Sequence, residues 1–330
     1  MLRAMDSAVA GLRAHQNKLD VIGHNLANVN TAGYKSQSYL FKEAMYQTST
    51  NSTAGSGSAN GSGGVNAAQY GYGTMMGSIW VDMGASTPTQ MGGLTATIDG
   101  EGFFMTMATA AINGGIANDT TEIKSSDFQY TRVGQFKIDS DGFLVDSNSN
   151  NFVYGFRTTN NAITGDPANN GAIDFSADLQ PIRVCMEDGT IDLDAPSQGA
   201  GSIALAKSVK IDSEGKITVG IQVTNNGVTE IKEAVIGQVA IATFQNQEGL
   251  TKAGGSYYTA SNGDNSGIVL ADKPGTAGSS GLITGYVEAS NVDMAKEFSE
   301  LITTQRGFQA NTKMITVSDQ ILEELVNMKR

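Results

Sequence analysis

Residues 2–26, LRAMDSAVAGLRAHQNKLDVIGHNL, carry the pattern that decides the predicted fold. Apolar side chains recur along this stretch at steps of three, four and seven residues, and Gln16 and Gly23 interrupt the series. A heptad seam of this kind is typical of an amphipathic α-helix that packs on a partner helix. The seam residues are Leu2, Met5, Val9, Leu12, Leu19 and Leu26.

A second seam closes the chain, and no proline interrupts it. Gln305, Thr312 and Asp319 occupy its intervening positions. Because one narrow apolar stripe does not stabilise an isolated helix in water, we expect the two terminal helices to pair with each other, in either direction. A helix pair docked on its own globular domain is the alternative. The second seam consists of Met294, Phe298, Leu301, Phe308, Ile315, Leu322 and Val326, with Ile302, Ile321 and Leu325 beside it.

The middle of the chain predicts β structure. Glycine accounts for 40 of the 330 residues, and short apolar runs alternate with Gly, Asn, Asp and Ser clusters, which is typical of hairpins. We therefore predict a multidomain, mainly β protein with antiparallel sheets and a coiled-coil-like layer of terminal helices. The expected parts are a helical assembly domain (1–30 and 291–330), an extended connecting segment (31–70), an inner β domain (71–150 and 236–290) and an outer β domain (151–235).

Two short stretches share one turn chemistry. Residues 137–142, KIDSDG, and residues 210–215, KIDSEG, each place an acidic turn with glycine between two apolar runs. The first superficially resembles a calcium loop, but Asn150 stands where an EF-hand needs a bidentate carboxylate, and no helices flank it. Both stretches therefore predict hairpin turns.

Composition and motifs argue against catalysis, cofactors and polyanion binding. The formal net charge is −12, whereas nucleic-acid binding needs a basic face. Cys185 is the only cysteine, and nothing near it in sequence would activate its thiol. His15 and His24 are nine residues apart, which suits no metal pair on one helix, so we expect both on solvated helix faces. We predict no enzyme, no cofactor and no metal site.

The two ends and the first β segments resemble the flagellar axial proteins, the rod–hook family. The resemblance covers residues 10–35, 98–104, 130–136 and 305–311. His24 and Gly307 stand where the family more often has Asn and Ala. In physical terms, Asn residues suit a helix end and turn, and a glycine after them permits a positive φ. The motif residues are Asn25, Asn28, Asn30, Gly33, Gln305, Arg306 and Asn311.

This resemblance implies a structural subunit that polymerises through its terminal helices into a tube. Within the family, the segments 36–48 and 64–73 and the length of the chain favour the curved, flexible hook, a universal joint that transmits motor torque to the filament. A distal rod subunit is the alternative, and a secreted β-rich adhesin is a more remote one.

The implied partners are further copies of the chain, the distal rod protein, the hook cap, the hook–filament junction protein and the flagellar type III export apparatus. Neither nucleic acid nor a small-molecule substrate is expected. The implied location is the extracellular hook, reached without a cleaved signal peptide. This agrees with the start of the chain, where no uninterrupted apolar run is present.

Overall fold

The computed structural model of the chain describes residues 2–55, 63–109, 116–157, 178–184, 205–225, 228–275 and 280–328. These residues form two compact units. Unit 1 contains residues 1–29, 36–82 and 292–330, and unit 2 contains residues 30–35 and 83–291. Each unit is therefore built from segments that are far apart in the sequence.

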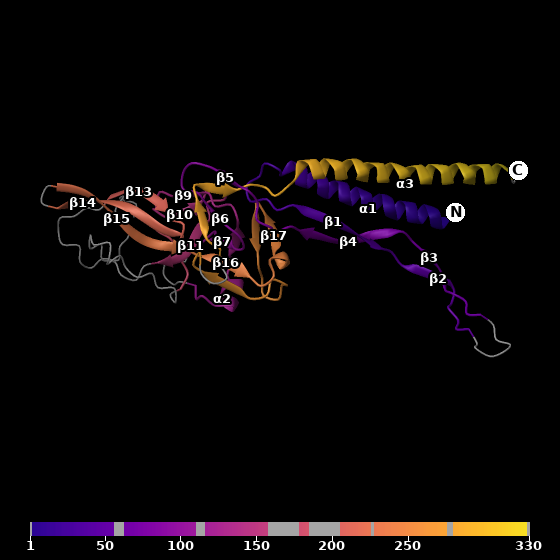
Figure 1. Ribbon diagram of the computed structural model, residues 1–330, viewed down its shortest axis with the longest axis horizontal. Coiled ribbons are helices and arrows are strands. Elements are labelled where there is room, and N and C mark those ends of the chain that lie inside the picture. The colour runs from indigo at the N-terminus through magenta and orange to yellow at the C-terminus, as the bar shows by residue number, and fades with distance from the viewer. Residues whose placement is uncertain are drawn as a thin grey trace. The chain divides into compact units, whose positions relative to one another are not determined.

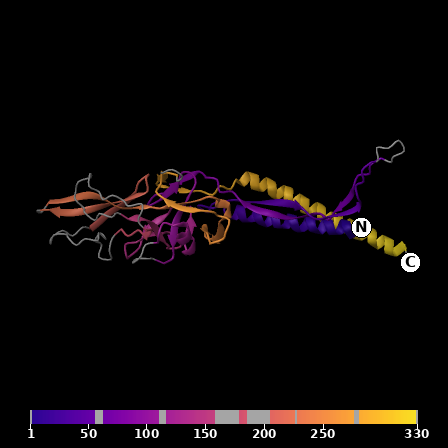
Figure 2. The same cartoon turned by 90° about the horizontal axis from the view of Figure 1, so that it is seen from below.

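Unit 1 is built on the two terminal helices. They are α1 (Leu2–Ala27) and α3 (Met294–Met328). Both views show the two helices side by side, with the two chain ends at the same end of the pair (Figures 1 and 2). The pair is antiparallel, because Asn25 near the end of α1 bonds Glu297 near the start of α3. The expected pairing of the terminal helices is thus present within one chain.

A β ribbon completes unit 1. The strands β1 (Gln37–Glu43) and β4 (Thr74–Val81) pair antiparallel from Gln37 opposite Val81 to Glu43 opposite Thr74. The ribbon continues as β2 (Tyr46–Thr50) and β3 (Ala68–Gly71). The sequence suggested only an extended connection over residues 31–70, because few of these side chains alternate clearly between apolar and polar.

Unit 2 is a mainly β body whose strand pairs are all antiparallel among the described residues. Its largest sheet has the strand order β13-β14-β15-β11-β7-β8-β18-β17, with five further strands attached. Two small sheets pair β20 with β6 and β21 with β5. The first half of the unit contains β5 (Pro88–Gln90), β6 (Ala96–Ile98), β7 (Phe103–Met107), α2 (Thr120–Ser125), β8 (Gln129–Thr131), β9 (Phe136–Ile138), β10 (Leu144–Asp146), β11 (Phe152–Arg157) and β12 (Gln180–Pro181). The second half contains β13 (Leu205–Ile211), β14 (Lys216–Asn225), β15 (Val228–Val239), β16 (Ile241–Phe244), the 3-10 turn η2 (Gln247–Gly249), β17 (Thr251–Gly254), β18 (Tyr257–Thr259), β19 (Val269–Asp272), β20 (Leu282–Thr284) and β21 (Tyr286–Glu288).

Two apolar clusters form the core of unit 2. One is aliphatic and centres on residues such as Leu144, Val153 and Ile241. The other is aromatic, with edge-to-face ring pairs such as Phe128 with Tyr154 and a close Phe103–Tyr258 contact. Burial of these side chains supplies the main driving force for folding of the unit.

The fold class expected from the sequence is confirmed: antiparallel β structure lies between two terminal helices. The two predicted acidic turns are hairpins, β9–β10 and β13–β14, and each turn glycine has a positive φ, +79° at Gly142 and +73° at Gly215. The division of the β part into inner and outer domains stays a prediction, because much of the outer segment, Cys185 included, lies outside the described residues.

Candidate assembly site

The contact between α1 and α3 is the candidate assembly site within unit 1. Four pairs set its register: Asn25 with Glu297, Lys18 with Glu300, His15 with Gly307, and Gly11 with Asn311. Their positions advance by three, four or seven residues on each helix. This is the spacing of a heptad contact, as the sequence predicted.

The contact face of α3 alternates large apolar with small or polar side chains. Leu301, Phe308, Ile315 and Leu322 are half-buried at every seventh residue, as expected. Between them lie Glu297, Thr304 and Ser318, which are buried, and Asn311. The sequence placed Gln305, Thr312 and Asp319 at these intervening positions, but all three are exposed. The predicted and the observed contact positions differ by a single residue along α3, and only the packing of α1 shows which set faces the contact.

On α1 the contact face is also displaced by one residue from the predicted seam. The face runs through Gly11, His15, Lys18 and Asn25. Of the predicted seam, Met5, Leu12, Leu19 and Leu26 are half-buried, Val9 is exposed, and the side chain of Leu2 lies outside the described part. Small residues at the contact let the two helix backbones approach closely, so the larger leucines lie at its flank.

Two glycines make this close approach possible. A Cβ on Gly307 would lie 2.6 Å from His15 Cε1, and a Cβ on Gly11 would lie 2.9 Å from Asn311 Nδ2. His15 is therefore packed rather than solvated, with its ring 5.4 Å from that of Phe41. Burial, and then the charge of Lys18, lowers the pKa of His15.

Asn25 is the residue that joins the three elements of unit 1. Its Oδ1 accepts a hydrogen bond from Gln37 N (2.9 Å), and its Nδ2 donates to Gln37 O (2.7 Å) and Glu297 Oε1 (3.0 Å). The amide thus pairs with the backbone of β1 as a neighbouring strand would, while it also bonds α3. Burial raises the pKa of Glu297, and the bond from Asn25 opposes that change.

We expect Asn25→Ala to lower the free energy of unfolding of the helical unit by about 1–3 kcal/mol, because it leaves the part-buried backbone groups of Gln37 and the buried carboxylate of Glu297 without these bonds. Urea unfolding followed by circular dichroism at 222 nm measures the change. Asn28→Ala is the matched control, because the exposed Asn28 Nδ2 donates to His24 O (2.9 Å) at the helix end. If the two substitutions lowered the free energy of unfolding equally, the bonds from Asn25 to β1 and α3 would contribute no more to stability than the single bond at the helix end.

The other motif residues serve turns and surfaces. Gly33 has a φ of +67°, as its sequence position suggested, and a Cβ there would lie 2.7 Å from Val133 Cγ2. Asn30 is exposed in the turn that follows α1. Gln305 is exposed, and Arg306 Nη1 donates to Gln309 Oε1 (3.3 Å) on the outer side of α3. These last side chains are placed to contact something other than α1.

The outer surface of unit 1 exposes many large apolar side chains. On the second half of α3 they recur at steps of three and four residues, which aligns them in one stripe. This stripe, called the α3 stripe below, consists of Met314, Val317, Ile321, Leu325 and Met328. Three predicted seam residues, Met294, Phe298 and Val326, are also exposed on α3, and the ribbon exposes Leu40, Phe41, Met75, Met76, Ile79 and Trp80. Exposed apolar patches of this extent mark interaction sites.

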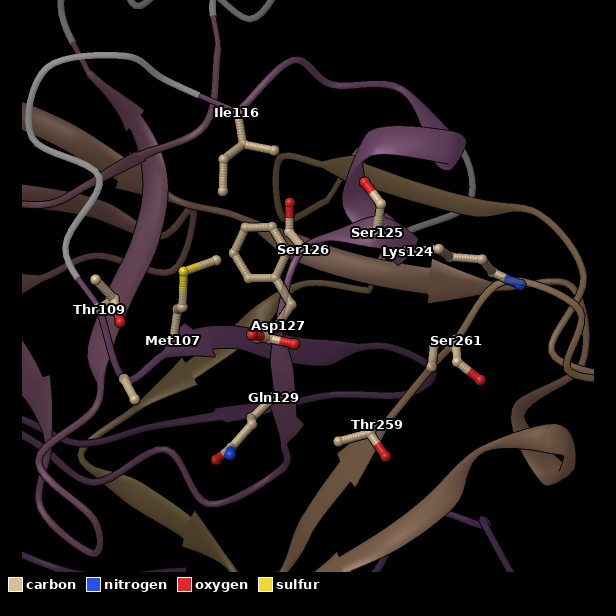
Figure 3. A pocket seen from close by; sticks show the side chains of 13 residues that line it. Met107, Thr109, Ile116, Lys124, Ser125, Ser126, Asp127, Gln129, Thr259 and Ser261 are labelled. Atoms are coloured by element: carbon tan, nitrogen blue, oxygen red, sulfur yellow. The ribbon is translucent and has the colours of Figure 1, made fainter.

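Unit 2 contains a half-open cavity of about 780 Å³ between α2 and the strands β7 and β18 (Figure 3). Part of its polar lining is engaged in internal bonds: Lys124 Nζ donates to Asp264 Oδ1 (2.9 Å), and the hydroxyls of Ser125 and Ser126 donate to Glu122 O. No histidine or cysteine is present among the described lining residues. The hydroxyls of Ser125 and Ser126 are thus bonded to a backbone carbonyl oxygen rather than to a side-chain base.

Two further properties of the described residues bear on function. No three His, Cys, Asp or Glu side chains gather there as a metal site would require. None of the described helices is both long enough and apolar enough to span a membrane.

Comparison with known proteins matches both helical ends. The family described as "Flagella basal body rod protein" matches residues 5–35, and the family described as "Flagellar basal body rod FlgEFG protein C-terminal" matches residues 283–328. The flagellar basal-body rod protein FlgG of Bacillus subtilis is 37% identical over 335 residues, which cover all of both chains. The chain belongs to the flagellar rod–hook family.

Rod and hook members of the family match differently. The rod protein FlgG of Borreliella burgdorferi is 28% identical over 333 residues, again across both whole chains. The hook protein FlgE of the same organism is 24% identical over 464 aligned residues, which also cover all of both chains. The hook protein FlgE of Treponema pallidum is 42% identical, but only over 133 residues. These residues cover 40% of the present chain and 27% of the Treponema protein. End-to-end similarity is thus greater to the rod proteins.

Proposed function

We propose that the chain is a structural subunit of the flagellar axial structure, and that it self-assembles at the distal rod. The observation that carries this proposal is the alignment with FlgG of Bacillus subtilis, which covers both chains from end to end at 37% identity. The sequence favoured the hook for two reasons: the segments 36–48 and 64–73 resemble those of a hook subunit, and the chain was expected to be too long for a rod subunit. The rod relatives remove the argument from length, because they match the whole chain over 335 and 333 aligned residues.

The geometry of unit 1 supports self-assembly. The α3 stripe and the apolar side chains of the ribbon are different surfaces of one chain, and both are exposed. A contact between different surfaces of identical subunits is heterologous, and it builds an open helical polymer when the rotation does not close. Aliphatic and aromatic side chains favour burial against a second copy over contact with water.

A hook subunit remains the second candidate, because a hook protein is 42% identical to the chain over 133 residues. In either position we propose that the chain meets other axial subunits and the flagellar export apparatus, and that its role is structural and requires no catalytic centre. The hook location and the hook partners expected from the sequence hold only for this second candidate.

Quantitative mass spectrometry of two fractions from the source bacterium tests the position. Hooks sheared from the cells form one fraction, and basal bodies that retain their rods form the other. Peptides of this chain should be concentrated in the basal bodies. Concentration in the hooks would favour the hook candidate. Absence from both fractions would contradict a role in the axial structure and would favour the alternative of a secreted adhesin.

A further inference from the structure

His15 lies at the point of unit 1 where α1 packs on both α3 and β1. Its ring is so close to Gly307 on α3 that a Cβ added there would lie 2.6 Å from Cε1, 2.8 Å from Nε2 and 3.1 Å from Nδ1. The ring of Phe41 on β1 lies 5.4 Å from that of His15, at an interplanar angle of 59°. One imidazole therefore packs against two elements that are distant from it in the sequence.

The Nδ1 atom of His15 is buried and has no hydrogen-bond partner within the described residues. A neutral imidazole can carry its one proton on Nε2, so that no N–H group points into the contact at Nδ1. The protonated ring carries an N–H group on each nitrogen, which adds a buried donor and a positive charge at the same point. Protonation is therefore unfavourable as long as the contact stays closed.

The charge next to His15 is positive. Lys18, one helical turn further along α1, pairs with Glu300 on α3 (Nζ to Oε2, 3.0 Å), so this carboxylate already has a cation. Burial, and then the charge of Lys18, lowers the pKa of His15 below its ordinary value of 6.5. The sequence of β4 contains no ionisable residue. The other ionisable side chains of the neighbouring segments are Arg306 on α3 and Lys42 and Glu43 on β1, which are exposed, and the buried phenol of Tyr39 on β1.

We infer that His15 is a pH-sensitive lock of unit 1, which holds α3 and β1 against α1 while its ring is neutral and loosens both contacts when the ring is protonated. Because the pKa of His15 is lower in the folded chain, the unfolded chain takes up the proton first as the pH falls. The stability that depends on the neutral ring is therefore complete above about pH 6.5 and decreases below it.

The lock goes beyond the proposed function, because it is a property of the single chain. Since α3 also carries the α3 stripe, acid would in addition act on the surface through which assembly is proposed. Only this second consequence rests on the proposed function.

Urea unfolding of the full chain at pH 7.5 and at pH 5.5 tests the lock, at a concentration at which the chain is monomeric. Circular dichroism at 222 nm follows the two long helices. His15→Gln removes the ionisable ring, and His24→Gln is the matched control, because His24 is exposed and is the only other histidine. From pH 7.5 to pH 5.5 we expect the unfolding constant of His24→Gln to rise at least about threefold more than that of His15→Gln, within the limit of about tenfold per pH unit for one proton.

The same dependence on pH in both histidine variants would overturn the lock. If His15→Gln does not fold, an NMR titration of the Cε1 proton in His24→Gln decides, because His15 is then the only histidine in the chain. The midpoint should lie below pH 6.5, and the further substitution Lys18→Met should move it upward, because it removes the neighbouring positive charge. A midpoint at or above pH 6.5 in His24→Gln would also overturn the lock.

Discussion

Ile321→Asp is expected to abolish polymer formation while the chain stays folded. Ile321 lies in the middle of the α3 stripe, where it is 41% exposed in the single chain. If the stripe is buried against a second copy, aspartate would place an unpaired charge in every subunit contact along the polymer. We expect the critical concentration for assembly to rise more than 100-fold, which corresponds to about 2.7 kcal/mol per contact.

Sedimentation of the purified full chain measures this effect, and circular dichroism shows whether the helices persist. Gln320→Asp is the matched control, because it adds the same charge to an exposed polar position one residue away. Phe308→Asp is a less selective test, because Phe308 is half-buried in the intrachain contact and its loss would also separate α3 from α1. Normal sedimentation of Ile321→Asp would contradict assembly through the stripe.

Gly134→Ala is expected to unfold or severely destabilise unit 2. A Cβ at this position would overlap the carbonyl oxygen of Ala96 and lie 2.9 Å from Phe104 Cε2. The backbone cannot move away without loss of the hydrogen bond from Ala96 N to Gly134 O (2.8 Å). Overlap with fixed backbone in a packed core belongs to the most damaging class of substitutions, and we expect a loss of about 4 kcal/mol or more.

Thermal unfolding measures this loss, with Gly92→Ala as the control. Gly92 has no atom within 4 Å of the added methyl group, so its effect should be within about 0.5 kcal/mol. A melting temperature of Gly134→Ala equal to that of the control would show that Ala96 and its strand can shift at little cost.

Local patterns in the sequence predicted the two terminal helices, their tendency to pair, the antiparallel β middle and the two acidic hairpins. Each of these depends on side-chain spacing or on turn residues within a few positions of one another. Asn25 and Gly33 were also found by motif. The bonds of Asn25 to β1 and α3 were not, because its partners Gln37 and Glu297 lie 12 and 272 residues away.

The segment that follows the first helix, and the choice between rod and hook, were harder to predict from the sequence. Residues 31–70 were predicted to be an extended connection, because apolar and polar residues alternate only weakly along them. Length was a poor guide to rod or hook, since rod relatives match the chain from end to end.

By itself, the sequence determined the two terminal helices, the antiparallel β middle of the chain and the family to which it belongs, because these follow from local spacing and motif. Only the tertiary structure decided which positions of the two helices face each other, and which charged side chains are buried in unit 2. Positions one residue apart on a helix give contact faces of similar apolar content, so the sequence pattern does not decide between them. The close approach of the two helices at Gly11 and Gly307 decides which positions face the partner helix. Likewise, Lys35, Arg132 and Glu288 resemble ordinary surface charges until the fold removes all three from water.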